Sequence, residues 1–139
     1  MDNHERLEKL AELIEEEKAW PAYFDDEGDL AVEVESKTFV FTFNDEEGNQ
    51  LRVILPTFWH IDSPEEAMLS LKAMNDANAQ VFGIKLFERE GWVTAEAQII
   101  GNHEQFVITY IETLMEVAEM FVTILSEMMI QMFIRGLRG

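Results

Sequence analysis

The chain has 139 residues, of which 28 are acidic and 10 basic, so its formal net charge is −18 at pH 7. A field of this sign repels phosphate backbones and argues against nonspecific nucleic-acid binding. The absence of cysteine excludes disulfides, thiolate catalysis and sulfur-ligated metal sites, and the length predicts one domain over residues 1–139.

The first predicted element is a helix over residues 3–18, in which leucines recur at helical spacing among charged side chains. Pro21 follows the helix and sets its end. Glu15, Glu16 and Glu17 lie in the last turns, which is the unfavourable end for the helix dipole. The stability of this helix must therefore come from docking its leucine face.

A run of strands is predicted next, separated by acidic turns. The segment 20–24 is a short edge strand, and alternating polarity predicts further strands over 30–34, 38–43 and 51–55. The sequence therefore predicts an antiparallel meander. We expect Pro56 and the segment up to Asp62 to break the sheet, because proline cannot donate to the ladder.

The start of a second helix is marked by Ser63, Pro64 and Glu66, which fit a serine cap, a proline in the first helical position and a capping box. This helix is predicted to run to about Ala79. Near its end, Asn75 and Asn78 can bond a strand backbone or terminate the helix, and we expect termination.

Two further strands, over 81–88 and 92–100, are predicted to form a hairpin across Glu90 and Gly91. The element order is then helix, three or four strands, helix, two strands, helix. This order predicts an α+β fold of the type α-β(3-4)-α-β(2)-α, with helices packed on an antiparallel sheet.

The last helix is predicted from Asn102 to Arg135, because its apolar residues recur in sevens and fours. Asn102 and Gln105 fit a capping box at its start, and Gly136 is expected to end it. Such a helix spans roughly 50 Å, whereas a compact chain of this length is only about 37 Å across. We therefore expect the helix to overhang its own domain.

The end of this helix lacks the polar face that its earlier turns possess. After Glu127 its apolar side chains surround the axis, interrupted only by Gln131: Met128, Met129, Ile130, Met132, Phe133 and Ile134. A second copy, a client protein or the first helix must cover them. The apolar segment 120–134 is shorter than the ~20 residues of a membrane span and contains Glu127, so no span is predicted.

No motif in the chain predicts catalysis, a metal site or a cofactor. His4, His60 and His103 lie far apart in sequence and have no second ligand at helical spacing. The acidic turn before Gly28 fails as a calcium loop, because its register places Tyr23 at the first ligand position. We therefore predict a protein that is not an enzyme and uses no cofactor.

The assembled order of elements resembles the YbjN-type family, proposed bacterial sensory transduction regulators whose fold is similar to that of type III secretion chaperones. An acidic hairpin, the end of the second helix, the next hairpin and the long last helix carry the resemblance, through Asp26, Glu27, Gly28, Asp29, Leu30, Asn75, Asn78, Glu90, Gly91 and Trp92. The resemblance implies a domain, commonly dimeric, that holds segments of other proteins without chemistry of its own.

The sequence thus predicts a non-enzymatic, homodimeric module that binds a segment of another protein, with the end of its last helix as the dimer or partner surface. The client segment is expected to lie extended along the sheet or as a helix in an apolar groove. The alternative is a small-molecule sensor with an apolar pocket between sheet and helices, lined by Phe39, Phe41, Phe43 and Trp92, although ordinary core packing also explains these aromatics. The N-terminus is polar rather than basic and then apolar, so we expect no secretory signal and a cytoplasmic location.

Overall fold

The computed structural model describes residues 2–44, 50–81, 83–100 and 106–138. Its elements confirm the predicted α+β fold. They are α1 (Asn3–Lys18), β1 (Ala22–Phe24), β2 (Leu30–Val34), β3 (Lys37–Phe43), β4 (Gln50–His60), α2 (Pro64–Gln80), β5 (Ile84–Arg89), β6 (Trp92–Ile100) and α3 (Val107–Arg138).

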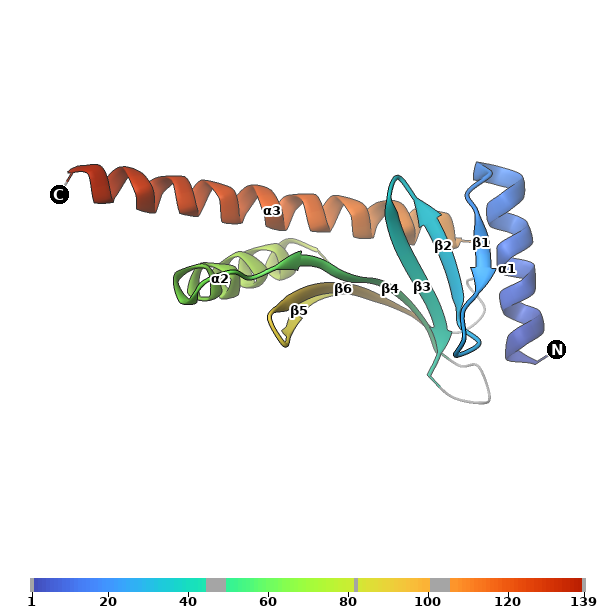
Figure 1. Cartoon of the computed structure of the whole chain (residues 1–139). Coiled ribbons are helices and arrows are strands. Elements are labelled where there is room, and N and C mark those ends of the chain that lie inside the picture. Colours follow the sequence, from blue (N-terminus) through green and yellow to red (C-terminus); the bar gives the residue numbers. More distant parts are fainter. Residues whose placement is uncertain (1, 45–49, 82, 101–105, 139) are drawn as a thin grey trace.

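The six strands form one antiparallel sheet in the order β1-β2-β3-β4-β6-β5. Phe41, Val53, Ala97 and Ile84 are register partners across four neighbouring strands, and all four are buried. All three helices contribute to the core on this inner face. Figure 1 shows α3 and α2 side by side along the sheet and α1 beside β1.

The first helix forms over the predicted residues. Asp2 caps it, since its Oδ1 accepts from the Glu5 backbone N–H at 2.8 Å. Leu7, Leu10 and Ile14 are buried in the core, so the leucine face docks as predicted.

Strand β4 differs from the prediction, because the sheet does not end at Pro56. The strand continues to His60 through a shift in register, and Thr57 in the shifted segment has φ = 46°. The Thr57 N–H donates to Oγ1 of Thr94 at 3.1 Å. Proline is accepted where a bulge removes the need for its N–H. The extension brings Phe58 and Trp59 under α3.

The predicted start of α2 is confirmed, with one change. The Glu66 N–H donates to Oγ of Ser63 at 3.1 Å, and Pro64 stands in the first helical position. In a capping box the Glu66 carboxylate would accept from the N–H of Ser63. Here it accepts from the Asp62 N–H at 2.8 Å and from Nε1 of Trp59 at 3.0 Å. These bonds satisfy a carboxylate that is almost fully buried and tie α2 to the end of β4.

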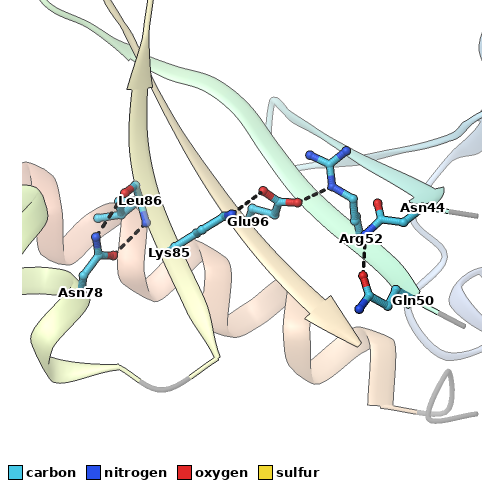
Figure 2. A network of polar contacts seen from close by, with 7 residues as sticks. All are labelled: Asn44, Gln50, Arg52, Asn78, Lys85, Leu86 and Glu96. Carbon is cyan, nitrogen blue, oxygen red and sulfur yellow. Dashed lines mark hydrogen bonds and ion pairs between the residues drawn. The ribbon is translucent and has the colours of Figure 1, made fainter. Parts of the chain in front are cut away.

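The predicted role of Asn78 in ending α2 is wrong. The helix continues to Gln80, and the Asn78 side chain clamps the backbone of Leu86 on the edge strand β5. Its Oδ1 accepts from the Leu86 N–H at 2.8 Å, and its Nδ2 donates to the Leu86 carbonyl at 3.1 Å (Figure 2). The clamp pairs backbone groups that an edge strand otherwise leaves open.

Substitution Asn78→Ala is expected to lower the free energy of unfolding by about 1–3 kcal/mol, because two hydrogen bonds to β5 are lost. Asn75→Ala is the matched control, since Asn75 is exposed on the same helix and gains the same helix propensity. Urea unfolding of both variants measures the difference. Equal stabilities would contradict the clamp.

Helix α3 is the longest element, with 32 residues, or about 48 Å. Its predicted cap at Asn102 and Gln105 lies outside the described residues. The predicted end at Gly136 is wrong, because this glycine has no positive φ and the helix continues to Arg138. Buried positions recur along α3 up to Leu125, and no described residue after it is buried. The end of α3 projects beyond the sheet and α2, as expected (Figure 1).

Candidate protein-binding surface

The projecting end of α3 exposes large apolar side chains. Phe133 is 67% exposed and Leu137 is 73% exposed, whereas Leu125, two to three turns earlier, is fully buried. Among the residues predicted as the docking surface, Met128 and Ile134 are partly buried, and the exposed members are Met129, Ile130, Met132 and Phe133. The apolar end predicted from the sequence is therefore open to solvent.

These side chains do not form one patch. Met128 and Met132 line a groove between α3 and α2 together with Gln131. Because successive residues of a helix are rotated by about 100°, Met129 and Phe133 lie on the opposite side of α3 from Gln131. The end of α3 therefore presents two faces, one toward α2 and one away from it.

The α2–α3 groove has a volume of about 1080 Å³. Its apolar lining consists of Leu69, Ala79, Ile124, Met128 and Met132, and its polar lining of Lys72, Asp76, Gln80, Glu127, Gln131 and Arg135. Methionine side chains are unbranched and adapt to varied surfaces. A groove between two helices with this lining suits another helix. The side of the groove that α2 forms was not predicted from the sequence, because most of the α2 residues that line it are polar.

By length and composition, α3 is also the one described helix that could cross a membrane, over Val107–Leu137. Core helices of soluble proteins meet the same criterion. In the folded domain, Val117, Phe121 and Leu125 are buried in the core, so a span would have to withdraw them. The predicted absence of a membrane span stays a prediction.

The four aromatic residues of the predicted pocket are not brought together. Phe39 and Phe41 are fully buried in the inner core, and Phe43 is partly buried under the Arg6 guanidinium, 4.4 Å from the ring centroid. Trp92 lies on the outer face of the sheet, where its ring packs against that of His60 with 4.6 Å between centroids and a tilt of 57°. The alternation along β6 indicates that Trp92 faces outward, since Val93 and every second residue after it are apolar and buried on the inner face.

The outer face carries a polar network that the sequence analysis did not identify (Figure 2). Glu96 is only 3% exposed and pairs with Nε of Arg52 and with Nζ of Lys85, the latter at 3.8 Å. These three residues line a hollow of about 500 Å³ together with Asn44, Phe87, Arg89 and Gln98. Glu96 of β6 thus lies between a cation of β4 and a cation of β5, so the buried carboxylate is paired rather than isolated.

Titratable groups elsewhere also form local pairs. Tyr23 donates its hydroxyl to Oε1 of Glu33 at 2.9 Å, and this hydrogen bond raises the pKa of Tyr23 above its ordinary value. Nδ1 of His60 lies 2.7 Å from Oδ1 of Asp62. Within residues 2–44, 50–81, 83–100 and 106–138, no three His, Asp or Glu side chains are grouped to hold a metal ion.

Comparison with known proteins gives no relative from which a function can be read. No protein family, curated protein or solved structure matches this chain. The resemblance to the YbjN-type family stays a prediction that depends on the hairpin and helix residues given above.

Proposed function

We propose that this protein is a non-enzymatic, homodimeric module of the cytoplasm that holds a segment of another protein, as its YbjN-type resemblance implies. The projecting end of α3 carries this proposal. Its exposed apolar side chains surround the axis, so a core on one side cannot cover them. Each large apolar side chain gains about 1.5–3 kcal/mol when it is removed from water, which makes association favourable.

The two faces of the end of α3 suit two occupants. The face toward α2 forms a groove lined by Met128 and Met132, and a second copy of the chain can cover these side chains with its own groove. The face away from α2, with Met129, Phe133 and Leu137, then remains for a client. An amphipathic helix of the client can dock there through its apolar side.

The double substitution Met132→Glu with Phe133→Glu tests this proposal. The charge at position 132, in the groove, is expected to raise the dimer dissociation constant at least about 100-fold, since burying an unpaired carboxylate is costly. The charge at position 133 lies on the client face. Both positions are exposed, so the variant should remain folded as a soluble monomer. Sedimentation equilibrium gives the mass, and circular dichroism reports the fold.

The matched control is Gln98→Glu on β6 with Thr109→Glu near the start of α3. Both side chains are exposed, and both lie outside the groove and the end of α3. The control variant should keep the mass and dissociation constant of the parent. A Met132 and Phe133 variant with unchanged mass and stability would contradict the proposal.

A further inference from the structure

The charges in the α2–α3 groove are separated by sign along its length. The two helices run in opposite directions (Figure 1), and the groove follows Leu69–Gln80 on α2 and Ile124–Arg135 on α3. Lys72 therefore lies toward the same end of the groove as Arg135. Asp76 lies toward the other end, with Glu127. The groove is basic at one end and acidic at the other.

We propose that a second copy of this chain covers the groove, with α3 on the partner's α3 and α2 on the partner's α2. A two-fold axis that passes between the two copies beside Gln131 relates them. The proposal rests on the homodimer of the proposed function and adds its arrangement. The opposite charges on each helix lie at equal distances from the axis. Glu127 and Arg135 each lie four residues from Gln131 on α3, and Lys72 and Asp76 each lie two residues from position 74 on α2.

Charge complementarity selects the second copy as occupant and fixes its direction. A two-fold axis perpendicular to the helices lays α3 on the partner's α3 in the opposite direction. Glu127 then faces the partner's Arg135, and Asp76 faces the partner's Lys72. An axis parallel to the helices would instead superpose basic end on basic end. Because like charges in contact oppose association, the first arrangement is favoured.

The residues around the axis suit a contact with their own copies. Glu127, Gln131 and Arg135 are spaced by four residues, so they share one side of α3. The side-chain amide of Gln131 has both donors and an acceptor, which lets it bond to the same amide across the axis. Met128 and Met132 supply flexible apolar volume to fill the groove. The exposed ion pairs then specify register, while apolar burial supplies most of the affinity.

A charge-reversal cycle on the full chain tests the arrangement. Glu127→Arg and Arg135→Glu each create two like-charge contacts per dimer, so each should weaken dimerisation by about tenfold or more at low salt. The double variant Glu127→Arg with Arg135→Glu should return to within about threefold of the parent. Glu116→Arg, an equal charge change at an exposed α3 position outside the groove, should leave dimerisation within about threefold. Dissociation constants are measured by sedimentation equilibrium at two salt concentrations.

The outcomes separate this inference from the proposed function. Weak single variants with a recovered double variant support the arrangement. A dimeric parent whose double variant dimerises no better than the single variants overturns the arrangement and leaves the homodimer in place. A monomeric parent at all concentrations overturns both.

Discussion

Substitution Phe121→Ala is expected to lower the free energy of unfolding by about 3–5 kcal/mol. Phe121 is fully buried on α3, and its ring meets Phe58 at 5.8 Å and Trp59 at 6.4 Å between centroids, edge to face in both cases. Alanine removes the buried ring and its two aromatic contacts and leaves a cavity. Urea unfolding followed by circular dichroism measures the loss.

The control for this substitution is Met68→Ala, at an exposed position of α2. Its effect is expected to stay within about 0.5 kcal/mol, as for most surface substitutions. If Phe121→Ala costs less than about 1 kcal/mol, then the extension of β4 past Pro56 does not anchor α3. The projection of the helix end would then lose its structural basis.

A chain that ends after Glu127 is expected to fold and to be monomeric. Every buried residue described on α3 lies at or before Leu125, so the shortened chain keeps the core. It loses the exposed apolar end and most of the α3 wall of the α2–α3 groove, namely Met128, Gln131, Met132 and Arg135. We expect its dimer dissociation constant to rise at least about 100-fold, since most of the apolar contact area disappears.

The stability of the shortened chain is the internal control for this prediction. The shortening removes only one described residue that packs against the core, the partly buried Met128. The midpoint of thermal unfolding should therefore fall by no more than a few degrees. A shortened chain that fails to fold would show that the last turns belong to the core rather than to an interface.

Local signals in the sequence were sufficient for most elements. The alternation of Phe39 and Phe41 with β-branched residues predicted β3, and the Ser63–Pro64 cap located the start of α2. In both cases the residues that form the element also carry the pattern. The overhang of α3 followed from its length alone, which exceeds the diameter of the domain.

The errors arose where a distant residue decides the outcome. Strand β4 continues through Pro56 because Oγ1 of Thr94 on β6 accepts a hydrogen bond from the Thr57 N–H across the bulge. Asn78 bonds to Leu86, eight residues later, rather than ending its own helix. None of these partners can be identified from the local pattern.

The candidate site was predictable only in part. The exposed apolar end of α3 could be predicted because the polar face of this helix ends at Glu127. The opposite wall of the groove was not visible, since Lys72 and Asp76 are polar and lie far away in sequence. The position of Trp92 on the outer face followed from its place in the alternation of β6, a signal that the pocket prediction did not use.

The most direct test of the homodimer is the solution mass measured by light scattering over a wide range of concentrations. The intact chain, of 16.1 kDa, should show twice this mass and dissociate only on dilution. The chain that ends after Glu127 should show the mass of one folded copy throughout. An intact chain that remains at the mass of one copy even at the highest concentration would contradict the proposed dimer.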